Sequence, residues 1–176
     1  MTKCLEKQRG ETPVVFLWIK SFKTLIIISF KEGIMNDTVK LLRECDAGIE
    51  MGVATINEVL DDVENDELKN FLCEAKKKHL EMGESLKREL DKYADEGKSP
   101  NPMAKGMSYL KTNMKMAFEP SDQTIAELVT DGCNMGVKSL NKYLNQFIEA
   151  SEKSKEITKA LIDVEEKLAI DIRRFL

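Results

Sequence analysis

The stretch Gly48-Ile49-Glu50-Met51-Gly52-Val53-Ala54-Thr55-Ile56-Asn57-Glu58-Val59-Leu60 returns 84 positions later as Gly132-Cys133-Asn134-Met135-Gly136-Val137-Lys138-Ser139-Leu140-Asn141-Lys142-Tyr143-Leu144. Glycine, methionine, glycine, valine, asparagine and leucine match, and Ile56 corresponds to Leu140. An internal repeat indicates two copies of one structural unit. Apolar residues recur at intervals of three and four in both copies, which is typical of a helix that buries one face. We therefore predict two related helical hairpins.

The repeated glycines, Gly48 and Gly52 in one copy and Gly132 and Gly136 in the other, work against helix formation. Each costs about 1 kcal/mol of helix propensity relative to alanine. Two glycines spaced four residues apart predict a close approach of helix backbones, and an opening for a ligand is the alternative.

The composition favours a single helical domain. The chain has 176 residues, of which 42% are hydrophobic and 33% charged, and its four prolines leave residues 35–99 and 121–176 proline-free. Long proline-free tracts rich in Glu, Lys, Leu, Met and Ala favour helix. We expect an all-α domain over residues 35–176, with helices at about 37–62, 66–93, 103–118, 122–148 and 152–175.

The expected helices form a four-helix bundle of two hairpins joined by a short cross-over helix, residues 103–118. Asn36-Asp37-Thr38 carries N-cap side chains for the first helix. Glycine and two prolines in residues 95–102 mark the linker before the cross-over. The buried face of the first helix is predicted to consist of Leu42, Cys45, Ile49, Gly52, Ile56, Val59 and Val63.

Residues 1–34 differ from the rest of the chain. They contain six Lys/Arg against three acids and two apolar runs, 14–19 and 25–30, each shorter than the ~20 residues needed to span a bilayer. Residues 31–35, Lys-Glu-Gly-Ile-Met, can be encoded by a ribosome-binding tract followed by a start codon. We expect residues 1–34 to be a non-native leader or a disordered extension. The alternative is an interfacial anchor, which would use residues 14–30, or a partner-binding arm.

The charge and the cysteine content limit which binding partners and which cellular compartment are expected. Residues 35–176 carry 21 Lys/Arg against 28 acids, and such an acidic domain is not expected to bind nucleic acid. The four cysteines form no CxxC pair and fall at helix-core spacing, which predicts buried thiols in a reducing compartment. We expect a cytoplasmic protein without a membrane partner, whose partner is another protein or a second copy in a homo-oligomer.

Residues 36–175 resemble the ferritin-like superfamily, and most closely its small uncharacterised bacterial members. The resemblance rests on the repeated hairpin, the Pro/Gly linker with a short helix, and Asp66-Glu67-Leu68-Lys69-Asn70-Phe71 opening the second helix. It implies a ferritin-like four-helix bundle. Active members hold two irons with a Glu from each of two helices and a Glu-x-x-His from each of the other two.

Carried over to this chain, the resemblance implies a degenerate di-iron site. Glu50 is the first-helix candidate, but its repeat partner is Asn134. His79 is the only histidine, and Lys76 stands where the motif has Glu. Counting outward from the hairpin turns brings acids of the other helices near this level. The candidate metal ligands are therefore Glu50, His79, Asp131 and Glu166, for iron or another divalent metal.

A structural role is the simpler interpretation of these residues. His79 on a helix seam is expected to hydrogen-bond Glu50 or a neighbouring backbone carbonyl. Glu50 lies one residue past the seam, and the run Glu165-Glu166 is expected to face solvent. With one histidine and no nucleophile elbow, nucleophilic catalysis has little support. No cofactor is expected on this interpretation.

These observations predict a non-catalytic ferritin-like bundle with a structural or interaction role, and the resemblance suggests stress or spore physiology. The first alternative is a metal-binding or di-iron oxidase-type bundle with an atypical site built on Glu50 and His79. The second is a peripheral membrane protein that uses residues 14–30.

Overall fold

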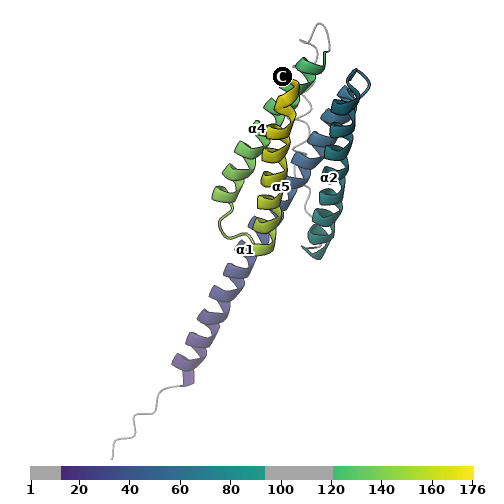
Figure 1. The fold of residues 1–176 in the computed structure, drawn as a ribbon. Coiled ribbons are helices and arrows are strands. Elements are labelled where there is room, and N and C mark those ends of the chain that lie inside the picture. Colours follow the sequence, from purple (N-terminus) through teal and green to yellow (C-terminus); the bar gives the residue numbers. More distant parts are fainter. Residues whose placement is uncertain (1–12, 94–120) are drawn as a thin grey trace, which may run out of the picture.

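The computed structural model describes residues 13–93 and 121–176, which form helices joined by short turns and contain no strand. Four long helices form the fold: α1 (Pro13–Val59), α2 (Asp66–Leu90), α4 (Asp122–Gln146) and α5 (Glu152–Asp171). The short 3-10 helices η1 (Asp91–Tyr93) and η2 (Ile172–Phe175) extend α2 and α5. Figure 1 shows α2, α4 and α5 gathered around the C-terminal half of α1, while its N-terminal half projects beyond them. The predicted all-α class is confirmed.

We call α1 and α2 the first hairpin, and α4 and α5 the second hairpin. Three of the four long helices begin where the sequence predicts, at residues 66, 122 and 152. The predicted cross-over helix, residues 103–118, and the linker before it lie outside the described residues.

The first helix begins at Pro13 rather than near residue 37. Proline is well suited to the first position of a helix because its missing N–H has no partner there. The predicted cap residues serve the second hairpin instead: the backbone N–H of Ser151 donates to Thr38 Oγ1 (2.8 Å), and that of Glu149 donates to Asp37 Oδ2 (3.3 Å). The cap prediction for α1 is therefore wrong, although the residues do act as hydrogen-bond acceptors.

The other helices have side-chain N-caps. Asn65 Oδ1 accepts from the backbone N–H groups of Glu67 (2.8 Å) and Leu68 (3.1 Å) at the start of α2, and Ser121 caps α4. An N-cap side chain of this kind stabilises a helix by about 0.5–2 kcal/mol. These caps confirm the predicted starts of α2 and α4.

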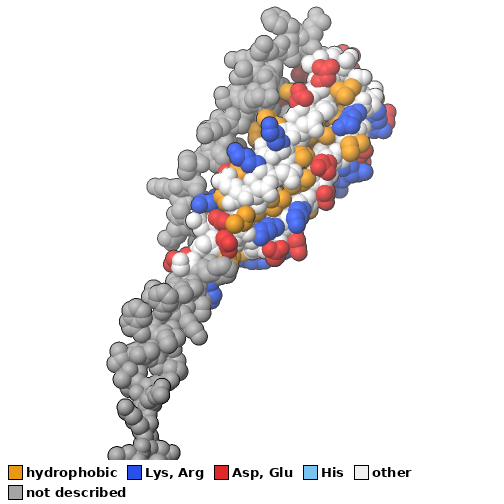
Figure 2. Space-filling model, turned by 90° about the vertical axis from the view of Figure 1, so that its left-hand side faces the viewer, with side chains coloured by type: hydrophobic (Ala, Val, Ile, Leu, Met, Phe, Trp, Pro, Cys, Tyr) orange, Lys and Arg blue, Asp and Glu red, His pale blue; other side chains and the backbone are white. Residues whose placement is uncertain are grey.

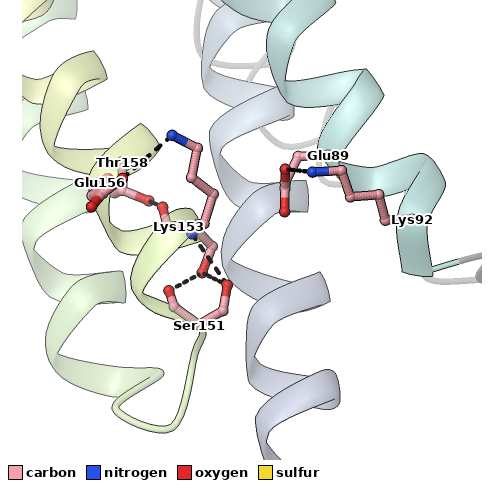
Figure 3. Close-up of polar contacts among 7 residues, drawn as sticks. Glu89, Lys92, Ser151, Lys153, Glu156 and Thr158 are labelled. Atoms are coloured by element: carbon pink, nitrogen blue, oxygen red, sulfur yellow. Dashed lines mark hydrogen bonds and ion pairs between the residues drawn. The ribbon is translucent and has the colours of Figure 1, made fainter.

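Ser151 caps α5, and Figure 3 shows it at the start of that helix. One turn away, Lys153 Nζ lies 3.3 Å from Glu156 Oε2, and near the end of α2 Lys92 Nζ lies 2.6 Å from Glu89 Oε2 (Figure 3). Exposed pairs such as Lys153–Glu156 contribute at most a few tenths of a kcal/mol to helix stability. The caps and the apolar core therefore determine the arrangement of the helices.

The predicted buried face of α1 is confirmed, since its apolar members are all buried. The core has two main clusters. The cluster near the α1–α2 turn includes Ile56, Val59, Leu68, Leu72, Val129, Leu168 and Ile172. The cluster at the opposite end includes Leu42, Cys45, Ile49, Leu86, Leu140, Leu161 and Ile162. Fully burying one Leu or Ile side chain stabilises a fold by about 1.5–3 kcal/mol, so packing of these faces holds the hairpins together.

The cysteines follow the prediction only in part. Cys45 and Cys133 are buried free thiols, as expected. Cys73 is exposed, because it lies between the buried positions Leu72 and Ala75 and points to the outer face of α2. Cys4 lies outside the described residues.

Candidate functional site

His79 occupies the centre of the bundle, where only 1% of the residue is exposed. Its Nδ1 lies 2.9 Å from the backbone oxygen of Ala75, and its Nε2 lies 2.9 Å from Glu165 Oε1. Glu165 is itself only 8% exposed. The predicted hydrogen bond to a backbone carbonyl is confirmed, and the carboxylate partner is Glu165 on α5 rather than Glu50 on α1.

The hydrogen bonds fix the protonation pattern of this pair. A carbonyl oxygen can only accept, so Nδ1 donates to Ala75, and Nε2 and Oε1 then share one proton. Burial by itself would lower the pKa of His79, but the hydrogen bond to Glu165 and the charge of that carboxylate outweigh burial and raise it above the ordinary value. The imidazolium form of His79 is therefore stabilised by its partner.

The repeated glycines adjoin this pair. A Cβ added at Gly52 would lie 3.1 Å from His79 Cδ2 and 3.2 Å from its Nε2, whereas one added at Gly136 would lie 3.7 Å from the carboxyl carbon of Glu165. The space left by each missing side chain is thus used by a buried polar group. No heavy atom outside the local helix lies within 4 Å of such a Cβ at Gly48 or Gly132. At Gly48 and Gly132 the prediction of close helix approach is wrong.

Cys133 on α4 adds a third group. Burial raises the pKa of its thiol, and the charge of Glu165 and a hydrogen bond to that carboxylate raise it further. The thiol therefore stays protonated at neutral pH. A buried protonated thiol is a poor nucleophile, because the thiolate is the reactive form.

A second buried polar contact joins the two hairpins. Cys45 Sγ lies 3.2 Å from Thr158 Oγ1, and the Thr158 hydroxyl donates to the backbone oxygen of Ser154 (2.8 Å). Because that hydroxyl proton is already used, the Cys45 thiol donates to Thr158. Burial raises the pKa of Cys45 to about 11, so this thiol is also protonated at neutral pH.

The other candidate ligands lie outside the buried pair. Glu50 is half-buried on α1, and Asp131 and Glu166 are exposed on α4 and α5. Glu166 is one residue past Glu165, and one residue turns a helix by about 100°, so its side chain faces solvent. Among the side chains that the structure describes, no three His, Cys, Asp or Glu groups lie together so as to hold a metal ion.

Sequence reasoning missed Glu165, because the run Glu165-Glu166 was interpreted as a solvated face. The spacing of Leu161, Glu165 and Leu168, four and then three residues apart, places Glu165 on the buried seam of α5. That spacing was the available signal. An acid on a seam needs a buried partner, and His79 was the only histidine to consider.

The surface of the described bundle is mixed in charge. Figure 2 shows basic and acidic side chains interspersed with hydrophobic ones on the face that it presents. A shallow open groove between α2 and α5 is lined by Lys78, Glu81, Met82, Ser85, Ile157, Ala160 and Val164. Within the described residues, none of the helices combines the length and the apolar character needed to cross a membrane.

Comparison with protein-family models, with curated proteins and with solved structures found no match to this chain. Its site is therefore interpreted from its own geometry.

Proposed function

We propose that this chain is a non-catalytic helical bundle of the ferritin-like type with a structural or interaction role. The observation that carries the proposal is the complete use of His79: each ring nitrogen has a hydrogen-bond partner inside the protein, at 2.9 Å. A general base or a metal ligand needs a nitrogen lone pair directed at a substrate or an ion.

The neighbouring groups are engaged in the same way. Glu165 on α5 pairs with His79 on α2, and its charge acts on the buried, protonated thiol of Cys133 on α4, so three helices contribute polar groups to one buried site. Fully satisfied buried networks of this kind fix the relative position of the elements that carry them. This favours a role for the network in holding the bundle together.

The chain connection supports the ferritin-like arrangement. The carboxylate of Asp122, the first residue of α4, accepts from the backbone N–H groups of Glu64 and Asn65 (both 3.0 Å), so α4 begins beside the α1–α2 turn. Tyr93, which ends η1, packs against the cluster at the opposite end of the bundle. The first hairpin thus ends, and the second begins, at opposite ends of the bundle, which is the arrangement expected of a ferritin-like bundle with one long cross-over connection.

A divalent metal site is the competing function. His79 Nε2 and Glu165 Oε1 are a nitrogen and an oxygen donor from two helices, and they lie 2.9 Å apart. Iron or another divalent cation would have to displace the proton that they share and recruit further ligands. Such a site would differ from the one predicted on Glu50, Asp131 and Glu166.

Metal analysis of the aerobically purified chain, followed by Fe(II) titration, tests the proposal. We expect far less than one metal ion per chain in the wild-type protein and in the His79→Ala and Glu50→Gln variants. Stoichiometric iron in the wild type that is lost in His79→Ala would overturn the proposal. If iron were also lost in Glu50→Gln, the metal would be bound by the ligands predicted from the sequence. If iron were lost only in His79→Ala and Glu165→Gln, the metal would be bound by the buried pair.

Peripheral membrane binding is a second candidate, favoured by the projection of the N-terminal half of α1 away from the bundle (Figure 1). Its apolar runs, residues 14–19 and 25–30, are separated by a segment that contains Lys20 and Lys23. Co-sedimentation with anionic lipid vesicles tests it. Binding by the full chain that disappears in a variant beginning at Met35 would establish this function in place of the first.

A further inference from the structure

The repeat seen in the sequence extends to the burial of both hairpins. Several buried positions of α1 and of the turn after it correspond to positions 84 residues later that are also buried. The buried pairs are Leu41 and Ile125, Leu42 and Ala126, Cys45 and Val129, Ile49 and Cys133, Ile56 and Leu140, and Val63 and Phe147. Positions of α2 match positions of α5 and η2 that lie 86 residues later. These buried pairs are Leu68 and Ser154, Leu72 and Thr158, Ala75 and Leu161, His79 and Glu165, Gly83 and Ala169, and Leu86 and Ile172.

The hydrogen bonds between the hairpins obey the same correspondence. Thr38 accepts from the backbone N–H of Ser151 at the second hairpin's turn, and Asp122 accepts from that of Asn65 at the first hairpin's turn. Thr38 corresponds to Asp122, and Asn65 corresponds to Ser151. Each hairpin therefore gives the other the same contact that it receives. That reciprocity defines an isologous interface, in which an approximate two-fold axis relates the two sides.

His79 and Glu165 correspond to each other and also bond to each other. Two equivalent positions across a two-fold axis meet only at the axis itself, so this pair marks the axis. The glycines agree: His79 packs on Gly52, and Glu165 packs beside Gly136, the repeat partner of Gly52. At this pair each hairpin thus faces its own equivalent position with an ionisable side chain.

Unlike residues are required at this position. Two Glu side chains 2.9 Å apart would repel each other in a buried site, and so would two imidazolium groups, whereas His and Glu satisfy each other. In the described part of the chain, this is also the one hydrogen bond that joins α2 to α5. The buried positions around it differ as well, since Leu68 corresponds to Ser154 and Leu72 to Thr158, but none of these four side chains carries a charge that would oppose the wrong pairing.

We propose that the His79–Glu165 pair is the specificity determinant of hairpin association. This pair favours packing of the first hairpin against the second. It disfavours packing of either hairpin against the same hairpin of another molecule of this protein. The partner that the His79 surface recognises is a hairpin of the same shape with a carboxylate on the axis. Specificity of this kind needs a repulsive element against the wrong partner, and the like-charged pair supplies it.

A residue swap in the full-length chain tests this proposal. His79→Glu places two carboxylates on the axis and Glu165→His places two imidazoles there, so each single variant should melt about 6–20 °C below wild type, the range expected when a buried pair is broken. The double variant His79→Glu/Glu165→His restores an unlike pair with the two residues exchanged. We expect it to recover more than half of the summed loss. Full recovery is not expected, because the exchanged carboxylate faces Ile49 in place of Cys133.

The exposed pair Lys77–Glu81 on α2, 4.0 Å apart, is the matched control. Its swap, Lys77→Glu/Glu81→Lys, and both of its single variants should shift the melting temperature by less than about 2 °C. If a single variant at the axis does not fold, the double variant is compared directly with wild type. The proposal would be overturned by a double variant that does not fold, or that melts no higher than the less stable single variant. Such a result would show that stability depends on which residue stands at position 79 and at position 165, and not on having one His and one Glu there.

Discussion

Replacing Gly52 with alanine should destabilise this protein, although alanine is the better helix former. A Cβ at residue 52 would lie 3.1 Å from His79 Cδ2 and 3.2 Å from Nε2. The imidazole cannot move away easily, because Ala75 holds Nδ1 and Glu165 holds Nε2, each at 2.9 Å. Either the ring shifts and weakens both hydrogen bonds, or α1 shifts and opens the core.

The size of the effect follows from two opposing contributions. Alanine gains about 1 kcal/mol in helix propensity over glycine. Overpacking a well-filled site costs about 1–3 kcal/mol, so Gly52→Ala should lower the free energy of unfolding by about 1 kcal/mol. At Gly48 and Gly132 nothing would meet the new methyl group within 4 Å, so alanine should raise that energy by up to about 1 kcal/mol. Gly136→Ala, with its nearest contact at 3.7 Å, should be neutral or mildly stabilising.

Urea denaturation of the four variants, followed by circular dichroism, measures this ranking. The separation between Gly52→Ala and Gly48→Ala should be about 2 kcal/mol, or about 4–8 °C in melting temperature for a chain of this size. His79→Gln combined with Gly52→Ala is the control, because a more flexible side chain relieves the clash. Equal stability of Gly52→Ala and Gly48→Ala would refute the argument that the ring of His79 is fixed in place.

Three further predictions follow from the same contacts. Because folding raises the pKa of His79, the stability that this residue contributes is complete below its pKa in the unfolded chain, about 6.5, and is lost as the pH rises through its pKa in the folded chain. The difference in melting temperature between wild type and Glu165→Gln should therefore shrink from about pH 6.5 upward. A difference that stays constant with pH would contradict this prediction. Thiol labelling of the folded chain at pH 7.5, read by peptide mapping, should modify Cys73 and leave Cys45 and Cys133 unmodified until urea is added; equal labelling of all three would show that the core is open. Asp122→Ala removes the acceptor for the backbone N–H groups of Glu64 and Asn65 and should lower the free energy of unfolding, measured by urea denaturation, by about 1–2 kcal/mol. The control is Gln123→Ala, which alters an exposed neighbouring residue and should change that free energy little.

Local patterns were sufficient to predict most of the fold. The spacing of Leu42, Cys45, Ile49 and Ile56 identifies the buried face of α1, and the expected starts at residues 66 and 122 agree with those of α2 and α4. These features depend on residues within one or two helical turns. The sequence around each helix is therefore enough to find them.

Features that depend on the other hairpin were predicted less well. Asp37 and Thr38 have the side chains of an N-cap, but their donors are backbone groups more than a hundred residues away, and α1 passes through them without a break. Glu165 was missed for the same reason, since an acid beside Glu166 resembles a solvated face until its partner is known. The candidate site could be predicted at His79 because a lone histidine on an apolar seam requires a buried partner.

The exchange of acceptors at the hairpin turns bears on how the chain folds. Thr38 completes the turn of the second hairpin, and Asp122 completes that of the first, so neither turn is fully hydrogen-bonded while its hairpin is alone. Docking of the hairpins and closure of both turns should then occur in a single cooperative transition. In native-state hydrogen exchange, the amide protons of Asn65 and Ser151 should open with similar free energies, although they lie at opposite ends of the bundle and in different halves of the chain.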